Sequence, residues 1–190
     1  MKSKQVRDLM VPLSDYATVS EDATLGEAVA ALKASQAGLD PGKHPHRAIL
    51  ILDKQHNVVG KISLLSILRA LEPKYDEMLS DKGPWHLGFT RKFQKAMFES
   101  LRLWQDPLEQ ICKKAAGTQV RTFMAAPVES EMIEIDASLG EAVHQLVIGN
   151  HQSLLVTDAG RVVGILRLAD VFQAVADAVL ECRPIPHPHG

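Results

Sequence analysis

The stretch that decides the fold is VVGKISLLSIL at positions 58–68, because it returns in altered form as VVGILRLADVF at positions 162–172. Each copy begins as a short apolar strand around a glycine and continues as a helix with apolar residues on one face. The two copies differ most where the strand meets the helix. The residues at these junctions are Ser63 and Ser66 in the first copy and Arg167 and Asp170 in the second.

The match extends upstream of these stretches. TLGEAV at 24–29 precedes SLGEAV at 138–143, and VRDLM at 6–10 precedes VRTFM at 120–124 by the same interval. The second half of the chain therefore repeats the first. The first copy carries an extra stretch around 38–46, whose proline and glycine content predicts a loop.

Each copy predicts the element order β-α-β-β-α. The first helix starts at a Thr or Ser that is followed three residues later by Glu, which is the spacing of a capping box. The two strands after it are apolar runs separated by a short turn, which is typical of a buried hairpin. The predicted strands are 16–20, 48–52 and 58–62 in the first copy and 132–136, 154–156 and 162–166 in the second. About 60 residues form a marginal domain alone, so the copies are expected to stabilise one another.

The intervening stretch at about 73–118 matches no part of either copy. Apolar residues recur there at about every fourth position, namely Phe89, Phe93, Met97, Leu101 and Trp104. A second helix is predicted with Asp106 as its N-cap, Pro107 as its first residue and Gly117 as its C-cap. The stretch is therefore expected to form two helices. Its aromatic stripe either packs inside the protein or forms a subunit or partner surface.

Composition excludes several classes of function. A net charge of -2 and a pI near 6.4 give no general attraction to nucleic acid or to an anionic membrane. The apolar runs are too short to span a bilayer and the start of the chain lacks a signal-peptide core, so we expect a cytoplasmic protein. Cys112 and Cys182 have no CxxC spacing and are expected to be reduced thiols. No catalytic motif and no metal-ligand spacing is present, so we expect neither an enzyme nor a metal site.

The doubled pattern, with Gly-apolar-apolar-Ser/Thr-x-x-Asp at the last strand–helix junction, resembles the tandem cystathionine-beta-synthase-type (CBS) domain pair, or Bateman module. The resemblance implies an α+β fold in which two β-α-β-β-α repeats pack pseudo-symmetrically. It places repeat one at 5–72, a helical insert at 73–118, repeat two at 119–180 and a flexible tail at 181–190. Such modules often form homodimers and require no cofactor, and their clefts commonly hold AMP, ADP, ATP or S-adenosylmethionine as regulatory ligands.

The resemblance also implies roles for single residues in the second copy. In the family, the Asp of the pattern accepts hydrogen bonds from both ribose hydroxyls, which makes Asp170 the expected ribose ligand. Arg167 stands where the family has Ser or Thr. It either pairs with a phosphate or fills the cleft and excludes the ligand.

In the first copy the pattern is incomplete in a different way. Ser63 occupies the Ser/Thr position, but Ser66 replaces the Asp, and one hydroxyl should bind ribose more weakly by about 1–3 kcal/mol. His46 and Arg47 resemble the His-Arg pair that precedes the second strand in nucleotide-sensing members, so Arg47 is an expected phosphate ligand. Ser63 and Asp170 would equally serve as helix-capping residues without any ligand.

Three functions remain open at this point. The first is a regulatory module that senses an adenosine nucleotide and signals to an unknown protein partner. The second is a ligand-free assembly module that uses the insert for oligomerisation or partner binding. The third is nucleic-acid binding through basic residues that would otherwise form a solvated helix face, namely Arg91, Lys92, Lys95 and Arg102.

Overall fold

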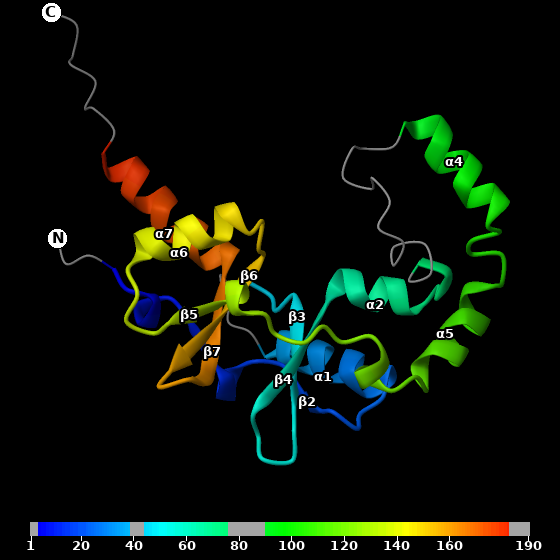
Figure 1. Ribbon diagram of the computed structural model, residues 1–190, viewed down its shortest axis with the longest axis horizontal. Coiled ribbons are helices and arrows are strands. Elements are labelled where there is room, and N and C mark those ends of the chain that lie inside the picture. Colours follow the sequence, from blue (N-terminus) through cyan, green and yellow to red (C-terminus); the bar gives the residue numbers. More distant parts are fainter. Residues whose placement is uncertain (1–3, 39–43, 76–89, 183–190) are drawn as a thin grey trace, which may run out of the picture.

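The structure is a computed structural model that describes residues 4–38, 44–75 and 90–182. These residues form two small sheets, each flanked by two helices of its own copy (Figure 1). The strands in spatial order are β2 (Thr18–Ser20), β3 (Ala48–Leu52) and β4 (Val58–Ser63) in the first sheet, and β1 (Val11–Pro12), β7 (Arg161–Arg167), β6 (Ser153–Asp158) and β5 (Met132–Glu134) in the second. The flanking helices are α1 (Leu25–Ala37), α2 (Leu64–Ala70), α6 (Leu139–Ile148) and α7 (Leu168–Glu181). The predicted α+β fold with two β-α-β-β-α repeats is confirmed.

The two sheets share one pairing scheme. In each copy the first strand runs parallel to the second, and the second runs antiparallel to the third. Leu50 of β3 lies opposite Lys61 of β4, and Leu155 of β6 lies opposite Ile165 of β7. Lys61 therefore occupies the position in the first copy that Ile165 occupies in the second.

The first helix of each copy begins as its sequence predicts. Thr24 accepts a hydrogen bond from the backbone N–H of Glu27, and the Glu27 carboxylate accepts the N–H of Thr24 at 2.7 Å. Ser138 and Glu141 make the same reciprocal pair. These capping boxes satisfy backbone donors that would otherwise be unpaired at the helix start.

The segment that precedes each copy packs on the other copy. Strand β1 pairs with β7, and Val6 donates its N–H to the carbonyl of Ala137 at 3.0 Å. The equivalent segment after the insert bridges back to β4 through Ala125, which pairs with Lys61, and Val120 donates to the carbonyl of Ala23. The two copies are therefore tied together by their backbones, which the sequence pattern did not predict.

Three apolar clusters form the core. Two of them lie mainly in one copy each, and each includes a residue contributed by the other copy, namely Val6 in the cluster of the second copy and Val120 in that of the first; the third joins the two sheets. The third cluster contains Tyr16, Ala48, Leu50, Leu155 and Ile165. Leu50 and Leu155 are fully buried in it, because each copy covers a sheet face that would otherwise meet water.

The insert contains the two expected helices, α4 (Arg91–Ser100) and α5 (Leu108–Ala116). Helix α5 lies beside α1, whereas α4 stands away from the sheets (Figure 1). The predicted C-cap Gly117 is confirmed, but the predicted N-cap is wrong. Pro107 has an extended ψ of 137° and itself occupies the N-cap position, so Asp106 lies outside the helix.

The predicted aromatic stripe is only partly helical. Helix α4 ends at Ser100, and Arg102 and Trp104 then adopt left-handed backbone with φ near 50° and 56°. The turn is held by the segment that follows α2, because the Lys74 ammonium group donates to the carbonyls of Leu101 and Arg102, and the Glu72 carboxylate accepts the N–H of Trp104. Phe89 lies outside the described residues, as does most of the predicted tail at 181–190.

We predict that Gly164→Ala destabilises the protein by about 1–3 kcal/mol, because the new Cβ would lie 2.5 Å from the backbone carbonyl oxygen of Val11 and force β1 away from β7. Urea denaturation measures the change in the free energy of unfolding. Gly117→Ala is the matched control, since no atom lies within 4 Å of its Cβ. Equal stability of the two variants would contradict the close approach of β1 to β7.

Candidate functional site

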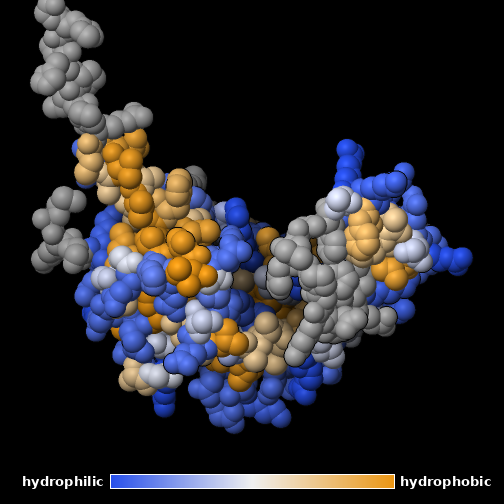
Figure 2. All heavy atoms as spheres, turned by 45° about the horizontal axis from the view of Figure 1, so that its top comes forward, coloured by the Kyte–Doolittle hydropathy of each residue, from blue (hydrophilic) through white to orange (hydrophobic). Residues whose placement is uncertain are grey.

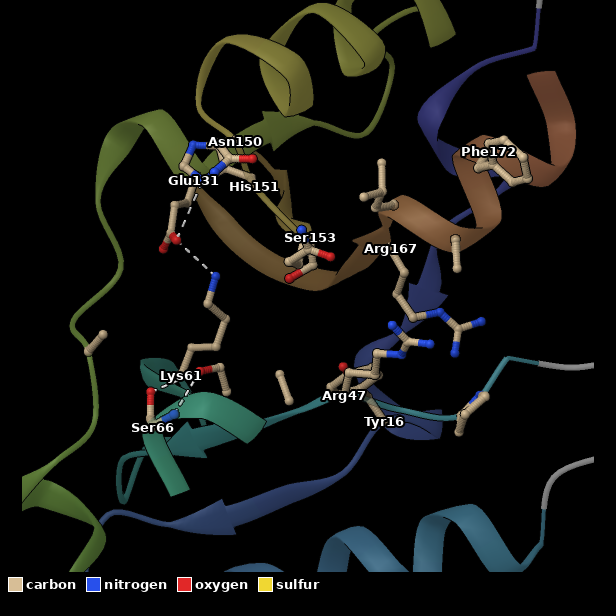
Figure 3. Close-up of a pocket in the computed structure, with 17 residues that line it drawn as sticks. Tyr16, Arg47, Lys61, Ser66, Glu131, Asn150, His151, Ser153, Arg167 and Phe172 are labelled. Carbon is tan, nitrogen blue, oxygen red and sulfur yellow. Dashed lines mark hydrogen bonds and ion pairs between the residues drawn. The ribbon is translucent and has the colours of Figure 1, made fainter. Parts of the chain in front are cut away.

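A cavity of about 560 Å³ lies between the two copies, at their strand–helix junctions (Figure 3). The first copy contributes the segment before β3 and the junction between β4 and α2. The second contributes the segment before β6 and the start of α7. The lining residues that carry charge or a hydrogen-bonding group include Tyr16, Arg47, Lys61, Ser63, Ser66, Glu131, His151, Ser153 and Arg167.

The predicted site residues fall into two neighbouring cavities. Those that line the central cavity are Ser63, Ser66, Arg47 and Arg167. His46 and Asp170 line a second cavity of about 510 Å³, together with residues of the segment that contains β1. Arg167 is the one residue, within the described part of the chain, that lines both cavities. The two cavities therefore meet at Arg167.

The Arg167 guanidinium group is engaged with both copies. It donates through Nη2 to Asp170 Oδ1 at 2.8 Å and through Nε to Asp170 Oδ2, and its Nη1 donates to the carbonyl of His44 at 2.6 Å. The Arg167 and Asp170 side chains are only 11% and 17% exposed. Both oxygens of the predicted ribose ligand are therefore occupied in this state.

At the first junction the two serines pair with each other. Ser63 is the N-cap of α2 and accepts the N–H of Ser66 at 3.0 Å, and the two hydroxyl groups lie 2.9 Å apart. This is the capping role that the sequence left open for Ser63. The hydroxyl groups nevertheless line the central cavity, because the N-cap position faces it.

His46 is a core residue. Its side chain is 2% exposed, and its ring meets the edge of Tyr16 with the centroids 4.3 Å apart. Burial lowers the pKa of His46 below its ordinary 6.5, and the positive charge of Arg167 acts in the same direction against the opposing charge of Asp170. Burial likewise raises the pKa of Tyr16 to about 12, although Arg167 opposes that shift. His46 is therefore placed to pack as a neutral ring.

Arg47 differs from the other cations of the central cavity. Lys61 pairs with Glu131, and Arg167 pairs with Asp170, whereas the exposed Arg47 has no carboxylate partner among the described residues. Figure 3 shows Arg47 and Arg167 near Tyr16, with the Lys61–Glu131 pair at the far end of the cavity. One end of the cavity therefore carries a positive charge that is available to an anion.

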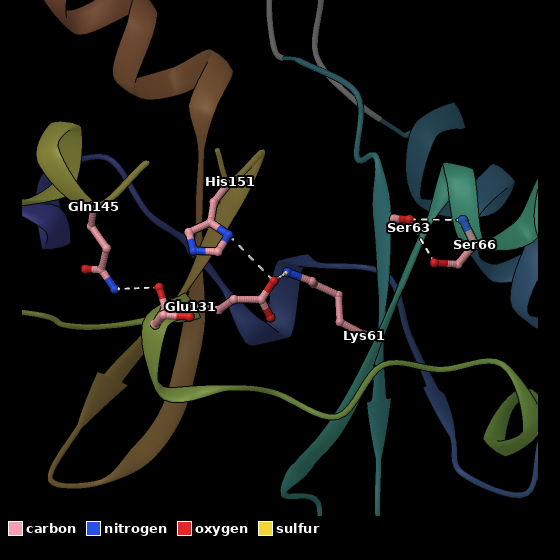
Figure 4. A network of polar contacts seen from close by, with 7 residues as sticks. Lys61, Ser63, Ser66, Glu131, Gln145 and His151 are labelled. Atoms are coloured by element: carbon pink, nitrogen blue, oxygen red, sulfur yellow. Dashed lines mark hydrogen bonds and ion pairs between the residues drawn. The ribbon is translucent and has the colours of Figure 1, made fainter. Parts of the chain in front are cut away.

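A polar network that the sequence did not predict lies at the other end of the cavity. Lys61 Nζ donates to Glu131 Oε1 at 2.9 Å, and His151 Nδ1 lies 3.8 Å from the same oxygen (Figure 4). Gln145 fixes the backbone on either side of Glu131 by donating to the carbonyls of Ser130 and Met132. Lys61 lies inside an apolar strand, at the position that Ile165 occupies in the other copy. This difference was the sequence signal that could have indicated the network.

Other chemistry finds no support in the described residues. Within them no three His, Cys, Asp or Glu side chains gather in a way that could hold a metal ion. The two cysteines are free and exposed. None of the helices in the described ranges is both long and apolar enough to cross a membrane.

The family model of the CBS domain matches the chain twice, at residues 6–73 and 120–177. The chain belongs to the CBS domain family. The two matches coincide with the two copies and leave the insert between them unmatched, so the tandem CBS pair recognised from the sequence is confirmed. No protein of curated function matched the chain.

Solved structures with the same fold include the CBS-pair protein CBSX2 from Arabidopsis thaliana, which is 18% identical, with a TM-score of 0.59 over 94% of this chain and 99% of that one. A structure of CBSX2 in complex with AMP is also 18% identical, with a TM-score of 0.57 over 92% and 98%. The cytosolic domain of the Mg²⁺ channel MgtE in complex with ATP is 18% identical, with a TM-score of 0.52 over 87% of this chain and 46% of that one. At this identity the likeness shows the fold of a CBS pair.

We predict that the Lys61–Glu131 pair couples the two CBS repeats. Its side chains are only 13% and 20% exposed, so removing one partner leaves the other poorly solvated. A double-mutant cycle with Lys61→Met and Glu131→Gln, measured by urea denaturation, should give a coupling energy of about 1–3 kcal/mol. Lys95→Met and Glu99→Gln form the control cycle, because that pair is exposed and spans 3.8 Å. If the coupling energy is below about 0.5 kcal/mol in both cycles, the Lys61–Glu131 pair does not couple the repeats.

We also predict that His46 makes folding sensitive to acid. A depressed pKa means that the folded protein holds His46 neutral, so its contribution is complete above pH 6.5 and is lost as the pH falls through the folded pKa. Wild type should lose more unfolding free energy than His46→Leu between about pH 7 and about pH 5. Chemical denaturation across this range measures both slopes. Parallel slopes would show that His46 titrates normally.

Proposed function

We propose that this CBS pair is a regulatory module that binds an adenosine nucleotide at the junction of the second repeat, with the phosphate in the central cavity. The observation that carries this proposal is Arg47, which has no carboxylate partner among the described residues and lines the central cavity together with Arg167, the partner of Asp170. A carboxylate suits a ribose diol, and two guanidinium groups suit a phosphate. The AMP and ATP complexes of related folds support the same ligand class.

In this arrangement the base and ribose occupy the second cavity. Its walls combine apolar side chains of the β1 segment, including Met10, Val11 and Pro12, with the carboxylate of Asp170. The apolar walls accept the faces of a purine, and the polar and charged lining residues, which include Asp8, Asp15 and Asp177 besides Asp170, fix its orientation. The phosphate then points past Arg167 toward Arg47.

The first junction is less suited to a ribose. Ser63 and Ser66 supply hydroxyl groups that are already bonded to one another, and Glu131 is the one carboxylate residue among the described residues that line the cavity with them. Glu131, the carboxylate that lines the same cavity, is held by Lys61. We therefore propose a single asymmetric site.

A regulatory role requires that ligand binding favour one arrangement of the repeats. The proposed site is suited to this role, because Arg47 and His46 come from the first repeat, whereas Arg167 and Asp170 come from the second. A ligand held by both repeats changes the free energy of their packing. The proposed output is a protein partner, and we propose no catalytic activity and a cytoplasmic location.

A homodimer is part of the proposal. Helix α7 exposes Phe172 at 67% and Val179 at 61%, and α2 exposes Leu65 at 57%. Figure 2 shows apolar side chains gathered over the α6 and α7 side of the molecule. Apolar surface of this kind is stabilised by burial against a second copy. The competing assembly function would use the same surface without a ligand.

We predict that AMP stabilises the protein against heat and that Arg47→Gln weakens its binding about 10–100-fold through the loss of charge-assisted hydrogen bonds. AMP at about 100 times its dissociation constant should add about 2.7 kcal/mol. For a chain of this size that raises Tm by roughly 5–10 °C. Thermal melts with AMP, ADP, ATP, S-adenosylmethionine and NADH give the ligand preference.

Two control variants separate the site from general effects of charge. Arg161→Gln removes an exposed arginine at the start of β7, and Asp158→Asn removes an exposed carboxylate at the end of β6. Both should respond to AMP like wild type, whereas Asp170→Asn should not. A lack of response to all of these ligands would leave the ligand-free assembly module as the function.

A further inference from the structure

Arg167 departs from the family pattern at the Ser/Thr position, three residues before the Asp170 carboxylate. It is the N-cap residue of α7, yet its side chain makes no capping hydrogen bond. It reaches instead to Asp170, in the first turn of the same helix, and to the carbonyl of His44 in the first repeat. A Ser or Thr at this position would place no cation on the Asp170 carboxylate and could donate only one side-chain hydrogen bond to it.

We propose that the Arg167–Asp170 pair is a latch that makes the site select phosphorylated nucleotides over nucleosides; the proposal rests on the function proposed above. A ribose diol that donates to both oxygens of one carboxylate uses the two facing lone pairs that Arg167 already holds on Asp170, so the diol and the guanidinium group cannot both bind in this bidentate way. Ribose binding therefore requires the guanidinium group to leave Asp170. The latch opens only for a ligand that offers this cation another acceptor.

The displaced guanidinium group of Arg167 needs a new acceptor because it is buried. The Arg167 side chain is 11% exposed, so a guanidinium group displaced by a neutral nucleoside would remain largely desolvated without its carboxylate. A phosphate replaces the lost carboxylate with an anion of matching bidentate geometry. Because Arg167 also lines the central cavity, the displaced group already borders the space that holds Arg47. The two arginines then share the phosphate charge.

The latch also links the ligand to the other repeat. In the closed state Arg167 Nη1 donates to the His44 carbonyl, in the segment that leads to His46 and Arg47. Opening the latch breaks this hydrogen bond between the repeats. The first junction has no equivalent device, since Ser63 and Ser66 form a neutral hydroxyl pair within α2 and its N-cap.

Isothermal titration of the full chain with AMP and with adenosine tests the latch. Wild type should bind AMP about 100-fold more tightly than adenosine, because only AMP compensates the displaced guanidinium group. In Arg167→Thr, adenosine should bind about tenfold more tightly than in wild type, while AMP weakens, so the two affinities converge. Arg161→Thr, on the same strand, is the control and should keep the wild-type ratio.

The outcomes separate this inference from the proposed function. If AMP binds but adenosine binds wild type within about threefold of it, or if Arg167→Thr leaves adenosine affinity unchanged, the latch is overturned and the nucleotide site stands. If neither ligand binds any variant, both proposals are overturned. Arg167→Lys, which keeps the charge but loses the bidentate fork, is the second variant should Arg167→Thr fold poorly. It should give an intermediate ratio, and a ratio equal to that of wild type counts against the latch.

Discussion

The structure depends on the packing of one sheet against the other. Leu50 and Leu155 occupy matching positions in the two copies and are fully buried in the cluster that joins them. Each copy is too small to bury both faces of its own sheet, so the shared cluster and the exchanged backbone pairing at β1 and Ala125 hold the pair together. Any ligand between the copies must act on this same interface.

The site arises where the internal symmetry of this interface fails. At matched positions the first copy has Lys61 and the second has Ile165, and only the isoleucine is fully buried. The lysine requires a carboxylate, which Glu131 of the second copy supplies. Polar groups thereby replace an apolar contact at one end of the interface, and the cavity extends from there to Arg47 and Arg167.

The sequence was sufficient to predict the local elements and the repeat. The Thr24–Glu27 and Ser138–Glu141 capping boxes are short-range interactions, and apolar periodicity depends only on neighbouring residues. Backbone pairing between β1 and β7 joins residues far apart in the chain and leaves no periodic trace in a strand of two residues. Pro107 was misplaced by one position, because a proline fits both just before a helix and at its first turn.

The same limit applies to the site. Matching the two copies placed Ser63, Ser66, Arg167 and Asp170 at equivalent junctions. Of the six predicted site residues, the four that line the central cavity are Arg47, Ser63, Ser66 and Arg167. The sequence could not show that Arg167 and Asp170 are already paired, because that pairing depends on their rotamers and on the His44 carbonyl of the other repeat. It also missed Glu131, which lies in a short turn outside both matched stretches.

One physical rule connects the two junctions. In both copies the proposed ligand positions are the N-cap and the third residue of a helix, and the side chains at these two positions bond to one another. With two hydroxyl groups this pairing is weak and neutral, whereas with a guanidinium and a carboxylate it is charged and largely desolvated. In the proposed site, ligand binding at the second junction is therefore an exchange of partners by Arg167, and the acceptor that the ligand offers decides whether the exchange is favourable.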